Sequence, residues 1–223
     1  MNGDVIMSGQ GFRIVDIEQD LIKANEELAR KVKNVFHEKG IKTYDIVGAI
    51  GAGKTAILEA VVERLKGKYR LALVTADVTT EIDADRIRRH GVKCVQINTG
   101  RECALTASLL QDVLGDIPLD DIDVLFVENV GNLICPADFI VGCDKRVVVV
   151  SITEGEHVVI KHPMLFKMSD VAVINKIDLR DVMDLDPEKM VRDAQEINPS
   201  IRVILTSAKT GEGIDELISA LEL

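Results

Sequence analysis

The residues Gly48-Ala49-Ile50-Gly51-Ala52-Gly53-Lys54-Thr55 fit the phosphate-binding pattern G-x-x-x-x-G-K-[ST] at every fixed position. Glycines in this pattern let the backbone curl so that several N–H groups point at one phosphate, which the positive end of the following helix also attracts. A β-favouring run at 44–47 and an apolar run with helical spacing at 56–65 provide the strand and the helix that the pattern requires. A glycine turn before an ordinary helix is the alternative interpretation.

We predict from this pattern that the loop binds the phosphates of a nucleotide. Lys54, expected as an exposed lysine of the loop, would reach the β- and γ-phosphates, and the Thr55 hydroxyl would bind Mg²⁺. The expected phosphate-binding residues are Gly48, Gly51, Ala52, Gly53, Lys54, Thr55 and Ala56.

A second motif, Asn175-Lys176-Ile177-Asp178, follows the strand-like run 170–174 and matches the guanine-recognition pattern N-K-x-D. Guanine presents its ring N1–H beside an exocyclic 2-amino group, and the carboxylate of Asp178 can accept both hydrogen bonds. Adenine has an acceptor at N1 and no donor at C2, so the carboxylate would be left unpaired at a cost of a few kcal/mol. Lys176 would lay its aliphatic stem on the ring, and Asn175 would brace neighbouring loops. These residues alone could form an exposed turn, but their place after a phosphate loop favours guanine recognition.

Two further elements occur in the order that is typical of guanine-nucleotide-binding proteins. The apolar run 123–127 ends in Glu128-Asn129-Val130-Gly131, which resembles D-x-x-G with glutamate in place of aspartate. Glu128 would hold Mg²⁺ through water, and the N–H of Gly131 would sense the γ-phosphate. After the run 203–206, Ser207-Ala208-Lys209 is similar to the S-A-K loop whose backbone contacts the guanine O6. Either could be a plain strand end by itself, but four elements in this order indicate that the chain binds a guanine nucleotide.

The composition limits the fold and the partners. At 223 residues, 47% of them hydrophobic, the chain can bury one sizeable core, which favours a single α/β domain. The formal net charge of −10 argues against a nucleic-acid partner, because phosphate backbones would be repelled. No run of ~18 apolar residues and no signal peptide occur, so we expect a cytoplasmic protein with no membrane partner. The cysteines Cys94, Cys103, Cys135 and Cys143 are expected to stay reduced there, which makes disulfides their less expected use.

The pattern along the chain predicts a P-loop NTPase fold: a doubly wound, mostly parallel, seven-stranded sheet flanked by helices, with an N-terminal helical extension. An amphipathic helix is expected over 17–39, with Asp16 and Gln19 as a capping pair, after a tail without periodicity at 1–12. We divide the chain into the tail and helix, residues 1–40, and one P-loop GTPase unit, residues 41–223. The predicted strands are 44–47, 71–75, 94–97, 124–127, 146–152, 171–174 and 203–206.

Three stretches outside the general motifs carry a more specific resemblance. Segment 77–87 resembles D-x-x-T-x-x-D-A-x-R, segment 96–103 is similar to Q-I-N-T-G-x-x-C, and segment 128–137 closely matches E-N-V-G-N-L-V-C-P-A. These are stretches of the hydrogenase-maturation GTPases that help insert nickel, the HypB family. The resemblance runs from about residue 16 to the C-terminus. It is to an archaeal-type short form, because the N-terminal metal motif and histidine-rich stretch of bacterial members are absent.

This resemblance implies roles for three carboxylate and hydroxyl groups. Asp77 would order Mg²⁺ or the attacking water, so that Lys54, Asp77 and Glu128 form the catalytic set. Thr55, Asp77 and Glu128 would hold Mg²⁺ beside bound GTP or GDP.

The resemblance also implies a metal site at two of the cysteines. Cys103 follows a predicted strand, and Cys135 follows the γ-phosphate-sensing loop. Two thiols are too few to close a metal site within one chain, but a two-fold axis would bring four thiolates together for tetrahedral Zn²⁺ or square-planar Ni²⁺. Reduced cysteines that pack as small hydrophobes are the alternative. Ala104 and Thr106 stand where the family usually has histidine and aspartate, so those ligands are missing.

The implied function is that of a slow GTPase and metallochaperone. Its homodimer would gate nickel delivery to a hydrogenase large-subunit precursor, with a second nickel-maturation protein as a partner. No arginine finger can be named, although Arg86 and Arg101 lie on suitable segments, and turnover without a finger is slow. The alternatives are a related metallocentre-assembly GTPase for urease or a cobalamin enzyme, and a metal-free GTP-dependent docking switch. Ala137 after Cys135-Pro136 argues against urease, which would require Cys-Pro-His.

Overall fold

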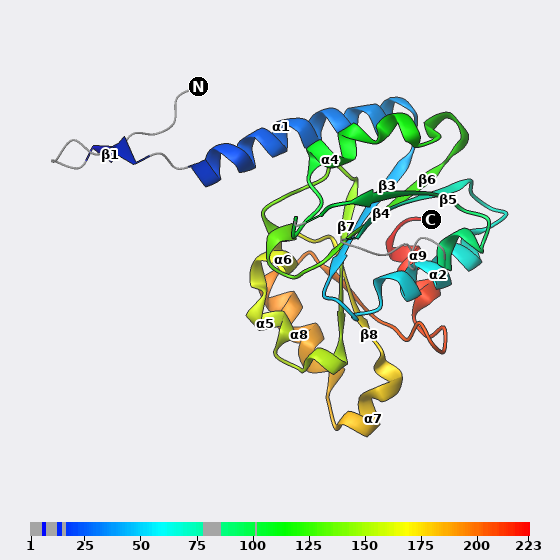
Figure 1. The fold of residues 1–223 in the computed structure, drawn as a ribbon. Helices are drawn as coiled ribbons and strands as arrows, with labels where there is room; N and C mark the ends of the chain where they lie inside the picture. Colours follow the sequence, from blue (N-terminus) through cyan, green and yellow to red (C-terminus); the bar gives the residue numbers. More distant parts are fainter. Residues whose placement is uncertain (1–5, 8–12, 15–16, 78–85, 101) are drawn as a thin grey trace.

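The computed structural model describes residues 6–7, 13–14, 17–77, 86–100 and 102–223 (Figure 1). Its centre is a seven-stranded sheet with the strand order β5-β4-β6-β3-β7-β8-β9, and every pairing within it is parallel. The strands are β3 (Lys42–Gly48), β4 (Leu71–Asp77), β5 (Lys93–Asn98), β6 (Val124–Gly131), β7 (Lys145–Ser151), β8 (Val171–Asn175) and β9 (Arg202–Leu205). All the strands predicted from the sequence are present, and the predicted doubly wound parallel sheet is confirmed.

Helices cover both faces of the sheet, because successive strand residues point to opposite sides. On one face, Phe126 and Val149 pack with α2 (Lys54–Leu65) and α9 (Ile214–Ala220). On the other face, the neighbouring Val127 packs near α1 (Ile17–Glu38) and α4 (Ala107–Asp112), and Val148 packs with the helices that follow β7 and β8. The helices that pack there are α5 (Val158–Lys161), α6 (Pro163–Lys167) and α8 (Pro187–Ile197), whereas α7 (Arg180–Met183) has no buried residue. This two-sided burial explains why most of the strands are rich in consecutive apolar residues.

Short 3₁₀ turns and one hairpin complete the description. The turns are η1 (Leu114–Asp116), η2 (Leu119–Asp121), η3 (Cys135–Ala137), η4 (Ile152–Glu154) and η5 (Ile177–Leu179). The short strands β1 (Ile6–Met7) and β2 (Arg13–Ile14) pair antiparallel. The rest of the predicted tail, and Asp16 of the predicted capping pair, lie outside the described residues. No described helix has both the length and the apolar character needed to cross a bilayer.

The long first helix ends at Glu38, one residue before the predicted boundary. Its first half projects beyond the sheet, whereas its second half packs on it (Figure 1). Ala29, Val32 and Phe36 of that second half are almost fully buried. Asn25 ties the helix to the loop before β7 and to the start of α4, because its Nδ2 donates to the Ile140 carbonyl at 2.8 Å and its Oδ1 accepts from the Ala107 N–H at 2.9 Å. The buried half of α1 therefore belongs to the same core as the sheet.

A buried ion pair lies beneath the loop that follows β6. The Nε of Arg146 donates to Asp45 Oδ2 at 2.8 Å, and both side chains are almost fully buried. Arg146 also donates to the carbonyl oxygens of Pro136 and Phe139, at 2.7 and 2.8 Å. The other oxygen of Asp45 accepts from Asn129 Nδ2 at 3.1 Å. Each charge is thus both paired and hydrogen-bonded, which buried charges require.

We expect Arg146→Met to lower the free energy of unfolding by about 3–5 kcal/mol, because it leaves the Asp45 carboxylate buried without its partner. The measurement is urea unfolding at pH 7. Arg192→Met is the matched control, because Arg192 pairs with Asp186 at the exposed surface, where such a pair contributes at most about 1 kcal/mol. Equal losses in the two variants would contradict the assigned importance of the buried pair.

Candidate functional site

The sequence motifs meet at the carboxyl ends of the strands, the edge at which open parallel sheets bind ligands. The glycine loop lies between β3 and α2, and the Glu128-to-Gly131 segment ends β6. Between them lies a cavity of about 350 Å³ whose walls include Gly53, Lys54, Thr55 and Glu128. Of the predicted residues, the phosphate-binding Gly51, Gly53, Lys54 and Ala56 therefore share one cavity with the magnesium candidates Thr55 and Glu128.

Two glycines of the loop are required by close contacts. A Cβ added at Gly48 would lie 2.0 Å from the Val149 carbonyl oxygen, and one added at Gly53 would lie 2.3 Å from Asn175 Nδ2. Both residues also have positive φ values, 149° and 101°, which side-chain-bearing residues rarely adopt. Gly51 has φ 78° with open space around it, Ala52 is fully buried, and Ala56 continues α2. The backbone thus takes the curled form that a phosphate cradle needs.

Lys54 begins α2 and is buried, so the expectation that it is an exposed loop lysine is wrong. Its ammonium group turns back into the loop and donates to the carbonyl oxygens of Gly48 and Ala49, at 3.1 Å each. The side chain is buried because the loop wraps over it. A phosphate bound in the loop would offer this ammonium a charged acceptor in place of two neutral ones.

The residues expected to hold Mg²⁺ are partly brought together. The Thr55 hydroxyl donates to Glu128 Oε1 at 2.7 Å in the wall of the cavity. Hydroxyl and carboxylate oxygens are ligands that suit Mg²⁺, so this donor set fits the ion. Asp77 is the last residue of β4, and its side chain, with the switch segment 78–85, lies outside the described residues. Thr75, which pairs in register with Glu128, lines the same cavity and was not anticipated from the sequence.

The predicted base-reading residues also lie together. Asp178 lies in η5, and its Oδ1 accepts from the Ser207 hydroxyl at 2.7 Å, which fixes the orientation of the carboxylate. Lys176 has a left-handed backbone with φ 65°, and its ammonium donates to the Gly51 carbonyl at 2.6 Å. The lysine stem therefore extends from the base-reading loop to the phosphate loop. Lys209, two residues after Ser207, is exposed.

Asn175 connects three loops of the site. Its Nδ2 donates to the Ala52 carbonyl at 2.9 Å, in the phosphate loop. Its Oδ1 accepts from the Thr206 hydroxyl and from the Ala208 N–H, both at 3.2 Å. The bracing predicted for Asn175 is therefore visible in the geometry, and it sets the spacing between the phosphate and base ends of the site.

A half-buried carboxyl group, that of Glu154, lies near Lys176 and Lys54. Glu154 closes a capping box at η4, where its Oε1 accepts from the Ser151 N–H at 2.8 Å. Burial raises the pKa of this carboxyl group, although the Ser151 hydrogen bond and the charges of Lys176 and Lys54 oppose the shift. The sequence motifs gave no role to Glu154. Its position makes it part of the electrostatic surroundings of the site.

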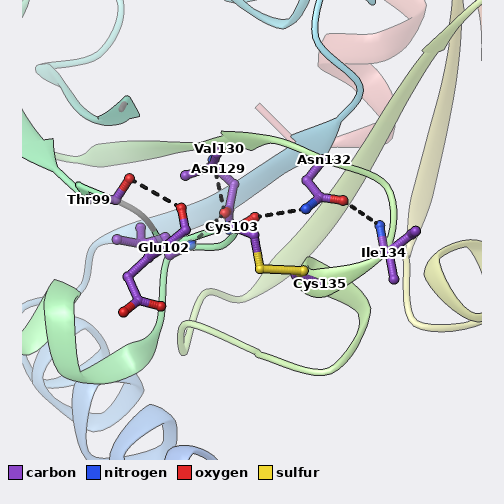
Figure 2. Close-up of a disulfide and its surroundings, with 9 residues drawn as sticks. Thr99, Glu102, Cys103, Asn129, Val130, Asn132, Ile134 and Cys135 are labelled. Carbon is purple, nitrogen blue, oxygen red and sulfur yellow. Dashed lines mark hydrogen bonds between the residues drawn. A yellow bond between two sulfur atoms is a disulfide. The ribbon is translucent and has the colours of Figure 1, made fainter. Parts of the chain in front are cut away.

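Cys103 and Cys135 lie together, but as a disulfide (Figure 2). Their Cα atoms are 6.1 Å apart, although 32 residues separate them in the sequence. The expectation that these cysteines stay unpaired is therefore contradicted for this pair. The loops after β5 and β6 converge at the edge of the sheet, and the sequence does not show this convergence. Metal binding by these sulfurs requires the reduced form, since the thiolate is the ligand.

The cysteine pair is not joined by further metal ligands in the part of the chain that the structure describes. Within that part, no group of three or more histidine, cysteine, aspartate or glutamate side chains is placed to hold a metal ion. Ala104 is buried, and Thr106 caps α4 by accepting from the Leu109 N–H. Cys94 and Cys143 are not in disulfides. Burial raises the pKa of the Cys143 thiol well above its usual value, with the Asp45 and Asp144 charges adding to the shift.

Residues 42–205 match the family model of the CobW/HypB/UreG nucleotide-binding domain. Over 209 residues the chain is 48% identical to the probable hydrogenase maturation factor HypB of Methanocaldococcus jannaschii, with 94% of this chain and 95% of that protein covered. The chain belongs to the HypB family. Membership makes it a P-loop nucleotide-binding protein of the GTPase class.

Two HypB crystal structures have the same fold as this chain. The structure of HypB from Archaeoglobus fulgidus matches with a TM-score of 0.84 and 42% identity, covering 90% of this chain and 98% of that one. The structure of HypB from Helicobacter pylori in complex with nickel matches with a TM-score of 0.83 and 31% identity, covering 89% and 94%. Both matches support the fold described above.

Proposed function

We propose that this protein is a GTP-hydrolysing metallochaperone that assists nickel insertion into a hydrogenase precursor. The proposal rests mainly on one observation: residues of the nucleotide cavity and a cysteine of the candidate metal site lie close together at the end of β6. Glu128 and Gly131 face the nucleotide cavity, and Cys135 follows four residues after Gly131. The names of the HypB relatives supply the client and the metal.

The nucleotide half of the proposal follows from the geometry of the cavity. The loop N–H groups and Lys54 bind the phosphates of GTP, and the carboxylate of Asp178 selects guanine. Mg²⁺, when bound, neutralises charge that develops on the phosphates, and Thr55, Asp77 and Glu128 are the residues that would hold it. Arg86 lines the cavity but pairs with Glu59 of α2, and we propose slow turnover because no arginine is assigned as a finger.

The metal half of the proposal rests on the convergence of two cysteines. Reduced Cys103 and Cys135 offer two thiolates, which is half of a four-ligand set for Ni²⁺ or Zn²⁺. We propose that a homodimer supplies the other two across a two-fold axis, and that GTP gates this dimer. A hydrogenase large-subunit precursor and a second nickel-maturation protein are the proposed partners. We propose the cytoplasm as the compartment, because its thiol buffers would reduce the disulfide between the two cysteines.

A metal-free GTP-dependent docking switch is the second candidate function. The disulfide favours it, because two sulfurs bonded to each other offer no thiolate to a metal. In that case the pair would only fix the loop after β6. The two candidates differ in whether the reduced protein retains nickel.

We expect the reduced protein to bind one Ni²⁺ per two chains, and Cys103→Ala or Cys135→Ala to lose that tight binding. The Ni²⁺ affinity should fall by more than ~100-fold. Removal of a residue that only hydrogen-bonds to a metal ligand costs at most about that much, so a larger loss indicates that the cysteine itself is a ligand. Equilibrium dialysis beside mass measurements of the oligomer tests both points. Cys94→Ala is the matched control, because Cys94 lies within β5 and away from the pair.

Guanine-nucleotide affinity distinguishes a lost site from a lost fold. Both cysteine variants should bind GDP as tightly as the wild type, since neither sulfur lines the cavity. Equal nickel affinity in the wild type and both variants would refute the cysteine site and leave the docking switch as the function.

A further inference from the structure

We propose that Asn132 is a positioning residue that transmits the nucleotide state to the Cys103–Cys135 pair. The proposal deepens the function above and rests on it for the role of the pair. Its basis is that one residue contacts the phosphate loop through its backbone and both cysteine loops through its side chain.

The backbone of Asn132 is joined to the phosphate loop. Its N–H donates to the Gly48 carbonyl at 3.0 Å, and the two residues form an isolated antiparallel bridge. The preceding residue, Gly131, lies so close to the loop that an added Cβ would be 2.4 Å from Ile50 Cγ1. A movement of the phosphate loop, or of Gly131 when it contacts the γ-phosphate, therefore moves the backbone of Asn132 as well.

The side chain of Asn132 is joined to both cysteine loops (Figure 2). Its Nδ2 donates to the carbonyl oxygen of Cys103 at 3.1 Å. Its Oδ1 accepts from the N–H of Ile134, the residue before Cys135, at 2.8 Å. The amide group of Asn132 thus hydrogen-bonds to the backbone of Cys103 and to the residue that precedes Cys135.

The far sides of the two loops are anchored in the core instead. The N–H of Leu105, two residues after Cys103, donates to the buried Asn129 Oδ1 at 2.8 Å. The carbonyl of Pro136, the residue after Cys135, accepts from buried Arg146 at 2.7 Å. Each cysteine therefore lies between a fixed anchor and the adjustable contact at Asn132. Movement of Asn132 changes the separation of the two sulfurs rather than shifting them together.

Such a change of separation has a large effect on a shared metal, because ligand distances are held within about 0.2 Å. The affinity for Ni²⁺ must then differ between the GDP and GTP states, and Ni²⁺ must change nucleotide affinity by the same factor. Couplings of this kind are typically about 5- to 150-fold. We expect a ratio of about tenfold for the wild type.

The test is Asn132→Asp, which keeps the acceptor for Ile134 but places a carboxylate against the Cys103 carbonyl. Ni²⁺ affinity of the reduced dimer is measured by competition with a chromophoric chelator, once with GDP and once with a non-hydrolysable GTP analogue. We expect the ratio of the two affinities to fall from about tenfold to below about twofold. The ratio is the readout because a merely structural loss would weaken both nucleotide states alike.

Asn198→Asp is the matched control. The amide of Asn198 also donates to loop carbonyls, those of Phe166 and Ser169, at 3.1 and 3.0 Å. Its Oδ1 accepts from the N–H two residues later, Ser200, at 3.1 Å, as Asn132 does from Ile134. This control should keep the wild-type ratio. A wild-type ratio in Asn132→Asp, a ratio near one in the wild type, or the same loss in both variants would overturn the proposal.

A readout without metal separates this inference from the proposed function. The two thiols give two electrons and two protons to oxidised glutathione, which leaves as two glutathione thiols while the protein disulfide forms. The equilibrium constant for this closure reports the separation of the sulfurs. If the wild type binds no nickel, the proposed function fails, yet the constant should still differ between GDP and the GTP analogue. No difference in the wild type, or the same difference in Asn132→Asp, would overturn the role of Asn132.

Discussion

Replacement of Lys54 by alanine is expected to reduce the rate of GTP hydrolysis by at least ~10²–10³-fold, the usual cost of removing one group that stabilises charge in a transition state. Lys54 begins α2, and its ammonium group donates within the phosphate loop to the neutral carbonyl oxygens of Gly48 and Ala49. Bound GTP replaces them with phosphate oxygens on which charge accumulates as the bond to the γ-phosphate breaks. The measurement is phosphate release at saturating GTP.

The control for this experiment is Lys66→Ala, at the opposite end of the same helix. Lys66 is half-exposed and pairs with Glu63, so its loss changes the helix surface but not the cavity. Because Lys54 is buried, thermal unfolding must be measured beside the rate, and similar melting temperatures are required for the comparison. Normal turnover by Lys54→Ala would show that the loop does not act on GTP.

The fold could be predicted because its signals are local. Runs such as 147–150 and 171–174 are apolar throughout, and only strands covered on both faces bury such runs. The phosphate-binding and base-reading motifs are also local, and each directly follows a run of residues that predicts a strand. Their meeting at one edge then follows from the parallel sheet, where all carboxyl ends lie together. The order of strands in the sheet has no local signal and came from the structure.

The contacts between distant segments could not be predicted in this way. The pairing of Cys103 with Cys135 depends on how the loop after β5 crosses β4 to reach the end of β6. The burial of Lys54 depends on a loop that folds back over its own lysine. Asn132 belongs to the stretch 128–137, yet nothing in that stretch indicates its contacts with Gly48 and Cys103. Hydrogen bonds of single side chains to remote backbone leave no periodic pattern in a sequence.

Replacement of Asp178 by asparagine is expected to weaken GTP binding by about 100-fold and to favour xanthosine triphosphate. The loss corresponds to one or two hydrogen bonds to a charged group, at about 1.5–3 kcal/mol each. The structure also predicts how the new amide will lie. The Ser207 hydroxyl donates to Oδ1 of Asp178 at 2.7 Å, so the amide oxygen should keep this bond and the amide nitrogen should face the base. That nitrogen can donate to the 2-oxo group of xanthine but not accept from the 2-amino group of guanine.

Competition between the two triphosphates for the same site measures this change of preference. Asp181→Asn is the matched control, because it makes the same substitution three residues away at an exposed position and should keep the preference for GTP. Ser207→Ala gives a further check on the geometry. Without the Ser207 hydroxyl, the asparagine can rotate and present either end, so Asp178→Asn combined with Ser207→Ala should show a weaker preference for xanthosine triphosphate than Asp178→Asn alone. An unchanged preference for GTP in Asp178→Asn would mean that another residue reads the base, and the joint position of Asp178 and Ser207 would then be only structural.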